Sequence, residues 1–121
     1  MIDVVCGVIK NGDKYLITQR GDKMNEGKWE FPGGKVKENE HLYDSIKREL
    51  LEELELDVTP IRKITSYTFQ DYNLTFILCK PHNISSIKLK EHKNLSWIEK
   101  NDFQNYNFLE GDVYFIKKYI F

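Results

Sequence analysis

One amphipathic segment, from about Glu40 to Leu54, constrains the fold of this chain more than any other feature. Apolar side chains recur there at steps of three and four residues, at Tyr43, Ile46, Leu50 and Leu54. This spacing places them on one stripe of an α-helix. Because such a stripe must be buried, the segment predicts a helix that packs against another layer of the fold.

Strand-like runs precede this helix. Residues 2–19 hold two β-rich runs separated by an Asn-Gly pair, which is a strong hairpin signal because both residue types accept positive φ. A brief strand at residues 29–31 ends at a Pro-Gly-Gly stretch, residues 32–34, which we expect to form a sharp corner. The first third of the chain therefore predicts a hairpin, a loop, a short strand and a turn.

Further strands and a second helix follow. The next segments alternate between strand-like and loop-like character: strands at 57–69 and 72–80, a loop at 83–95 and a short strand at 96–98. Pro60 should lie at a bulge or an edge, and residues 112–121 predict a last helix that Asp112 can cap. This order predicts an α+β fold in which a mixed β-sheet lies between α-helices, in one domain over residues 1–121.

Charge and cysteine content limit the classes of function. The chain carries 18 basic and 19 acidic residues, so its net charge of -1 predicts no affinity for nucleic acid polymers or membranes. An anionic ligand would need a bound cation or a few placed Lys and Arg side chains. Cys6 and Cys79 lie in apolar, strand-like surroundings without CxxC spacing, which predicts buried thiols. No secretory or membrane-spanning pattern is found, and we expect a cytoplasmic location.

Carboxylates crowd one turn of the predicted helix. Glu49, Glu52 and Glu53 fall within an arc of about 100° beside the apolar stripe, where like charges destabilise a helix unless a cation is near. Converging carboxylate oxygens suit Mg²⁺ or Mn²⁺. A tight turn at Gly33 and Gly34 would let a backbone carbonyl face them. The alternative is a solvated charged face.

Residues 34–56 resemble the Nudix box, G-x5-E-x7-R-E-U-x-E-E-x-G-U, in which U is a bulky aliphatic residue. The matching positions are Gly34, Glu40, Arg48, Glu49, Leu50, Glu52, Glu53 and Leu56. Glu55 stands where the family has glycine, which raises a question of stability at the helix end because that position supplies no ligand. The stretches "WEFPGGK" and "EHKNLSWI" resemble the MutT-type branch, which hydrolyses nucleoside triphosphates to monophosphates and pyrophosphate.

The resemblance implies a catalytic centre around the box. The implied metal ligands are the carbonyl of Gly33 and the carboxylates of Glu49, Glu52, Glu53 and Glu91. Glu52, Glu53 or Glu91 would be the general base that takes a proton from water. Arg48 would pair with the box glutamates and fix their rotamers, and Glu40 would do similar supporting work. The alternative for Glu91 is an ordinary loop charge.

Substrate contacts are expected from five side chains: Arg20, Glu30, Lys35, Phe69 and Asp112. Arg20 and Lys35 are candidates for phosphate binding. Phe69, with the edge of Tyr67 or Tyr72, could stack a base. By resemblance, Glu30 and Asp112 match nucleotide-contacting positions. Three of these residues have an alternative role: Arg20 as a solvated surface arginine, Phe69 in core packing and Asp112 as a helix cap.

The resemblance therefore implies a Mg²⁺-dependent nucleoside triphosphate pyrophosphohydrolase acting on 8-oxo-dGTP, on a (d)CTP-like nucleotide, or on both, in nucleotide-pool sanitisation. We expect a small-molecule nucleotide as its partner and a monomer or a dimer. One alternative is a dinucleoside polyphosphate hydrolase, because Tyr72 follows the box. Another is a non-catalytic nucleotide-binding module, against which the intact box glutamates argue. The short chain argues against most ADP-ribose hydrolases.

Overall fold

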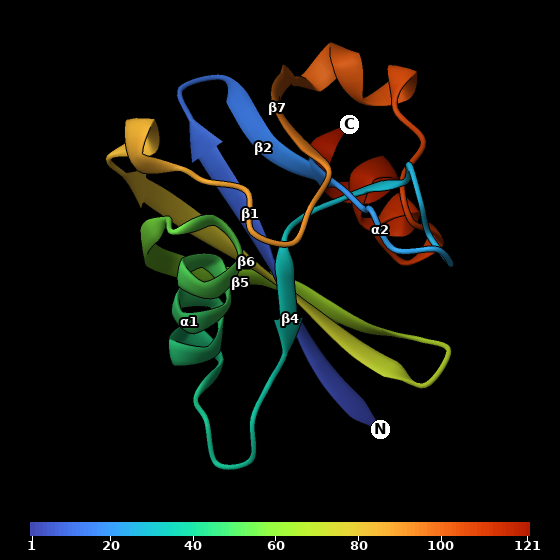
Figure 1. Cartoon of the computed structure of the whole chain (residues 1–121). Coiled ribbons are helices and arrows are strands. Elements are labelled where there is room, and N and C mark those ends of the chain that lie inside the picture. Colours follow the sequence, from blue (N-terminus) through green and yellow to red (C-terminus); the bar gives the residue numbers. More distant parts are fainter.

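The computed structural model describes all 121 residues, and its centre is a mixed, 7-stranded sheet (Figure 1). The main strand order is β3-β2-β1-β6-β5, with β4 paired to β1 and β7 paired to β2. The strands are β1 Ile2–Asn11, β2 Lys14–Gln19, β3 Trp29–Glu30, β4 Gly33–Lys35, β5 Asp57–Phe69, β6 Tyr72–His82 and β7 Asn94–Glu99. Strands β1 and β6 run parallel, and the other pairs are antiparallel. The mixed sheet of the predicted α+β fold is confirmed.

The hairpin predicted at residues 2–19 is present, and the second predicted pair of strands also forms a hairpin. Strands β1 and β2 meet at a two-residue turn in which Gly12 has φ 61° while Asn11 stays in the strand. Strands β5 and β6 meet at Gln70, which has φ 54°. The register of β5 shifts between Pro60 and Arg62, which confirms the bulge expected at this proline, and β5 is an edge strand.

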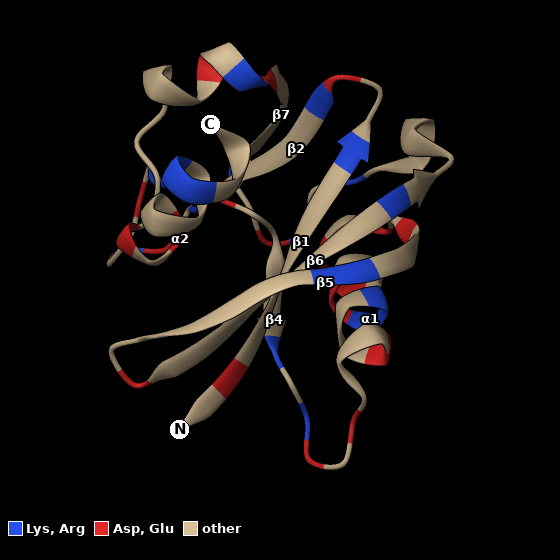
Figure 2. Cartoon of the chain, turned by 180° about the vertical axis from the view of Figure 1, so that it is seen from behind, with Lys and Arg blue, Asp and Glu red and all other residues tan.

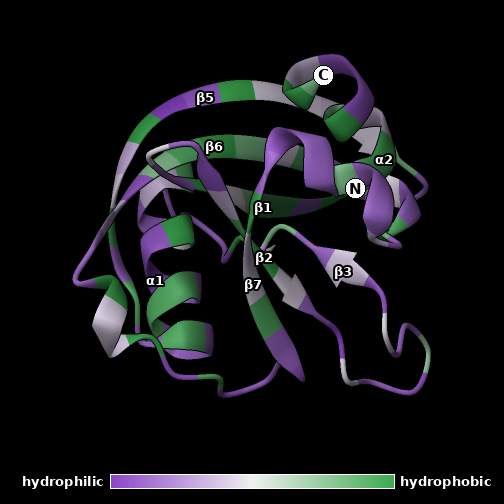
Figure 3. Cartoon of the chain, turned by 90° about the horizontal axis from the view of Figure 1, so that it is seen from above, coloured by the Kyte–Doolittle hydropathy of each residue, from purple (hydrophilic) through white to green (hydrophobic).

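Helix α1 spans Leu42–Leu54 and covers one face of the sheet (Figure 1). It begins two residues later than expected because His41 caps it: the His41 Nδ1 accepts a hydrogen bond of 3.0 Å from the Tyr43 N–H. The predicted stripe is buried at Ile46, Leu50 and Leu54. Figure 3 shows apolar and polar stretches alternating around α1, as packing on a sheet requires.

The other face of the sheet is covered by the C-terminal segments, the short helical turns η2 Lys100–Asn105, α2 Glu110–Phe115 and η3 Ile116–Ile120. The predicted helix at 112–121 therefore begins earlier and is split. Its N-cap is Leu109, so the expectation that Asp112 caps the helix is wrong; Asp112 lies inside the first turn. The aromatic rings of Phe31, Phe76 and Phe115 pack together in the hydrophobic core between these segments and the sheet.

The segment between β6 and β7 is mostly loop, as expected, with a short turn η1 at Ile84–Ser86. Strand β7 is longer than the predicted 96–98 and pairs with β2. Cys6 and Cys79 are buried free thiols, which confirms their predicted state. Both signs of charge are spread over the molecule (Figure 2), and none of its helices has the length and apolar character needed to cross a membrane.

Glu55 ends α1 in the left-handed conformation, with φ 51°. A glycine adopts this conformation without the steric cost that a Cβ carries. We therefore expect Glu55→Gly to raise the melting temperature by about 2–5 °C, because the exposed ion pair from Glu55 to Lys90 that it removes contributes little. Calorimetry of Glu55→Ala is the control, since alanine loses the ion pair and keeps the strain. An equal or lower melting temperature for Glu55→Gly would show that the strain is negligible.

Candidate active site

The Pro-Gly-Gly stretch does not form the expected tight turn. Gly33 and Gly34 belong to β4, pair with Cys6 and Val5 of β1, and have no positive φ. Glycine is required here because there is no room for a side chain. A Cβ on Gly33 would overlap the Val5 carbonyl, and one on Gly34 would overlap the Glu49 carboxylate. Because these glycines have no side chain, the backbone of β4 lies directly against the Val5 backbone at Gly33 and against the Glu49 carboxylate at Gly34.

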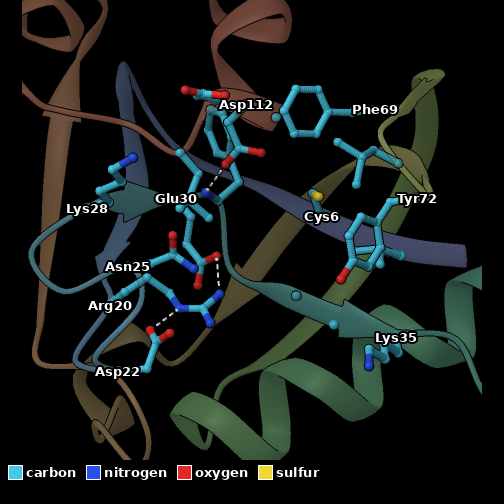
Figure 4. A pocket seen from close by; sticks show the side chains of 18 of the residues that line it. Cys6, Arg20, Asp22, Asn25, Lys28, Glu30, Lys35, Phe69, Tyr72 and Asp112 are labelled. Atoms are coloured by element: carbon cyan, nitrogen blue, oxygen red, sulfur yellow. Dashed lines mark hydrogen bonds and ion pairs between the residues drawn. The ribbon is translucent and has the colours of Figure 1, made fainter. Parts of the chain in front are cut away.

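An open pocket of about 880 Å³ lies beside β4 (Figure 4). Eight of the residues predicted from the sequence line it: Arg20, Glu30, Gly33, Lys35, Glu53, Phe69, Glu91 and Asp112. Figure 4 shows Asp112 and Phe69 close together, with Arg20 and Asp22 farther along the pocket. The fold thus brings together side chains from strands, loops and both ends of the sequence.

Three predicted residues, Arg48, Glu49 and Glu52, are not part of the pocket lining. Arg48 links the two glutamates, because its guanidinium contacts Glu49 at 2.9 Å and Glu52 at 3.3 Å. It also contacts Glu40 at 2.8 Å, and this hydrogen bond lowers the pKa of Glu40 to about 2. The Arg48 Nη2 donates to the carbonyl of Lys35, which ties α1 to β4. This network agrees with a supporting role for Arg48.

Among the predicted metal ligands, Glu53 has a carboxylate whose hydrogen-bonding capacity the protein leaves partly unmet. Its side chain is buried, and its Oε1 has no hydrogen-bond partner. Burial, together with the nearby charges of Glu30, Glu49 and Glu91, raises the pKa of this carboxyl to about 9. A buried acid that faces other acids without a cation is costly. A divalent cation therefore fits the donors around Glu53.

The acidic side chains nevertheless form no ready cluster of three or more groups around one point. Glu49 is held by Arg48, and Glu52 has a largely exposed side chain that also contacts Arg48. The two would have to turn toward Glu53 for all three to bind one ion. Small rotations of this kind are available to long side chains at a helix surface.

Asp112 lies at the other part of the pocket and is 5% exposed. Its Oδ2 accepts a hydrogen bond of 3.0 Å from the Phe31 N–H. Burial raises the pKa of Asp112 to about 8, although the Phe31 N–H acts in the opposite direction. The raised pKa favours the protonated carboxyl near neutral pH, and a protonated carboxyl can donate a hydrogen bond as well as accept one.

The aromatic residues divide between the pocket and the core. Phe69 and Tyr72 line the pocket, and Phe69 also packs against the core. Tyr67 is not part of the lining, so the expectation that its edge could stack a base is not supported: its ring stacks on Phe76, and its hydroxyl donates to the Gly111 carbonyl. Apolar lining is also contributed by Cys6, whose thiol pKa burial raises.

Glu30 is engaged on both oxygens by protein groups. Its Oε1 contacts the Arg20 Nη1 at 3.2 Å, and its Oε2 contacts the His92 Nε2 at 2.7 Å. Arg20 also contacts Asp22 at 2.8 Å, so it is not the freely solvated arginine of the alternative interpretation. The sequence analysis missed His92, and its position directly after Glu91 is the signal that could have found it.

Comparisons with known proteins agree with this geometry. A family model for the NUDIX domain matches residues 4–118. An 8-oxo-dGTP diphosphatase of Buchnera aphidicola subsp. Schizaphis graminum is 38% identical over 109 residues, which cover 88% of this chain and 83% of that protein. A CTP pyrophosphohydrolase of Escherichia coli (strain K12) is 29% identical over 117 residues, covering 93% and 87%.

Solved structures show the same likeness. The solution structure of the E. coli ORF135 protein has a TM-score of 0.83 and 26% identity, and the match covers 99% of this chain and 89% of that one. A MutT structure, from work on the proteins of Aliivibrio salmonicida and Vibrio cholerae, has a TM-score of 0.78 and 30% identity, with coverage of 98% and 96%. The likeness extends over nearly the whole chain.

Proposed function

The chain belongs to the Nudix family of hydrolases, and we propose that it is a nucleoside triphosphate pyrophosphohydrolase of the MutT type. The reaction converts a nucleoside triphosphate and water into a nucleoside monophosphate and pyrophosphate. The observation that carries the proposal is Glu53, a buried carboxyl with an unpartnered oxygen, in the wall of a pocket that also holds Phe69 and Asp112.

Nudix hydrolases use a divalent cation, and for this chain we infer Mg²⁺, or Mn²⁺ in its place. The groups that would hold it are the Gly33 carbonyl and the carboxylates of Glu49, Glu52, Glu53 and Glu91. Carboxylate and carbonyl oxygens are the ligands that these hard cations prefer. When bound, the cation would neutralise phosphate charge and acidify a water molecule.

The protein's own groups would supply the remaining chemistry. One carboxylate, from Glu52, Glu53 or Glu91, would accept the proton of the attacking water. Attack at the β-phosphorus, which the resemblance implies, would release the nucleoside monophosphate as the leaving group. Arg48, which forms ion pairs with Glu49 and Glu52 in the metal-free protein, would orient these two carboxylates once they turn toward the cation.

Binding would use two parts of the pocket. Arg20, Lys28 and Lys35 line it and would contact phosphate oxygens, and Arg20 would exchange its contact with Asp22 for one with the substrate. The base would stack near Phe69, with Asp112 at its edge. We propose 8-oxo-(d)GTP, (d)CTP-like nucleotides or both as substrates, because relatives with these activities match most of the chain.

The test is release of pyrophosphate from a panel of ordinary and oxidised nucleoside triphosphates, measured with Mg²⁺ and with EDTA. We expect release only with Mg²⁺ and a clear preference within the panel. Activity confined to dinucleoside polyphosphates would move the assignment to that branch, which Tyr72 in the pocket lining keeps relevant. Nucleotide binding without any product would identify a non-catalytic module. The single domain, the cytoplasmic location and the monomeric or dimeric state stay predictions.

A further inference from the structure

Residues 88–92, called here the docked segment, run along the C-terminal end of α1. The Lys88 N–H donates to the Leu54 carbonyl at 2.9 Å, and the Lys90 N–H donates to the Glu53 carbonyl at 3.0 Å. Carbonyls at a helix end need such donors because they have no partner within the helix. The docked segment therefore caps the helix that carries the box glutamates.

This docking places Glu91 near Glu53. Lys90 is bonded to the backbone of Glu53, and the next residue, Glu91, faces the Glu53 side chain closely enough to raise its pKa. Both carboxylates line the same pocket. The position of Glu91 relative to the box thus depends on how firmly the docked segment is held.

Two side-chain contacts hold the docked segment. Lys90 Nζ contacts Glu55 Oε2 at 2.7 Å, but these side chains are 50% and 40% exposed, and exposed pairs contribute little. His92 Nε2 contacts Glu30 Oε2 at 2.7 Å, with side chains only 4% and 13% exposed. The buried contact is the stronger one, since a hydrogen bond to a carboxylate gains strength away from water.

Glu30 is a firm point of attachment. It lies in β3, which pairs with Thr18 and Gln19 of β2. The sheet and α1 thus hold the docked segment from two sides, with Glu91 between the two attachments. Packing alone does not explain a histidine here, because its Nδ1 is buried without a hydrogen-bond partner, which costs stability.

We propose that His92 is a positioning residue, which holds Glu30 and thereby keeps the docked segment in place with Glu91 facing Glu53. This inference rests on the proposed function, since the placement of Glu91 affects turnover only if the box is catalytic. It concerns the hydrogen bond and not a change of charge on the ring.

The first test compares His92→Ala, His92→Gln and His82→Ala. His82 is the matched control, an exposed histidine that contacts Thr59 outside the pocket. We expect His92→Ala to lower kcat about tenfold with little change in KM, as loss of a group that orients a ligand typically does. Gln can still donate to Glu30, so it should restore most of kcat, and His82→Ala should match the parent. Equal losses for Ala and Gln would overturn the proposal.

The second test asks whether His92 acts through Glu91. In a Glu91→Gln background, His92→Ala should lower kcat much less than it does in the parent, because the group that it positions is already impaired. A full, additive loss would mean that His92 acts by another route, and the proposal would be wrong.

The third test does not depend on activity. Hydrogen exchange of the metal-free protein reports the N–H groups of Lys88 and Lys90, which docking protects. We expect these amides to exchange about tenfold faster in His92→Ala and to be unchanged in His82→Ala. Unchanged exchange in His92→Ala would overturn the proposal. An inactive parent enzyme would instead contradict the proposed function, while the exchange rates would still report whether His92 holds the segment.

Discussion

Glu53→Gln should lower turnover at least about a hundredfold while the fold persists. Glutamine keeps the shape of the side chain but removes one charged oxygen ligand from the donors that would hold the cation. Glu52→Gln should behave in the same way if both carboxylates belong to the centre. Pyrophosphate release at saturating Mg²⁺ measures the effect.

The matched control is Glu38→Gln, since Glu38 is an exposed glutamate outside the pocket lining. It should keep the parent's turnover. Near-parent activity of Glu53→Gln at saturating Mg²⁺ would show that the box is not the catalytic centre of this protein.

Glu53→Gln should also raise the melting temperature of the metal-free protein, and the size of this gain should depend on pH. In the folded state burial raises the pKa of Glu53 from 4.5 to about 9, so the folded protein binds this proton more tightly than the unfolded chain. The contribution of Glu53 is thus most favourable below the unfolded pKa and is lost as the pH rises toward the folded pKa. Melting temperatures in EDTA should therefore favour Glu53→Gln increasingly between these two values. A constant difference across this range would contradict the raised pKa.

Asp112→Leu should lower kcat/KM by about 10- to 100-fold, with different factors for cytosine and 8-oxoguanine triphosphates. The physical reason is that a site discriminates strongly when a buried polar group loses its partner. Leucine removes the group that would face the base edge. The two substrates present different donors and acceptors there, so the loss should change the preference and not only the rate.

Asp112→Asn tests the protonation state. The pKa of Asp112 is raised to about 8, so the parent should lose its donor above that pH, whereas the asparagine amide donates at every pH. We expect similar preferences for the two proteins at about pH 7 and diverging ones at about pH 9. Melting curves at both pH values check that each variant is folded.

A uniform loss on both substrates in Asp112→Leu would leave Asp112 with the structural task of accepting the Phe31 N–H. Base selection would then have to come from other groups of the pocket, such as Phe69 or Tyr72.

Local patterns in the sequence determined much of the scaffold. The spacing of Ile46, Leu50 and Leu54 predicted α1, the Asn-Gly pair predicted the first hairpin, and β-branched and aromatic runs predicted the second pair of strands. The box pattern placed its glutamates on one helix and pointed to the family that the comparisons show. These features are readable because helix periodicity, strand alternation and turn chemistry depend on neighbours a few residues apart.

Contacts between distant segments were decided only by the tertiary structure. Asp112 contacts the backbone of Phe31, 81 residues away in the sequence, and His92 contacts Glu30, 62 residues away. No local pattern could therefore show that Asp112 and His92 are buried against these partners. Gly33 and Gly34 were predicted for a turn, but they are required because β1 and α1 leave no room for a Cβ. The packing of the layers decides which polar groups are buried and which hydrogen-bond donors contact them. Packing brings together residues that are far apart in the sequence, so local patterns do not predict these contacts.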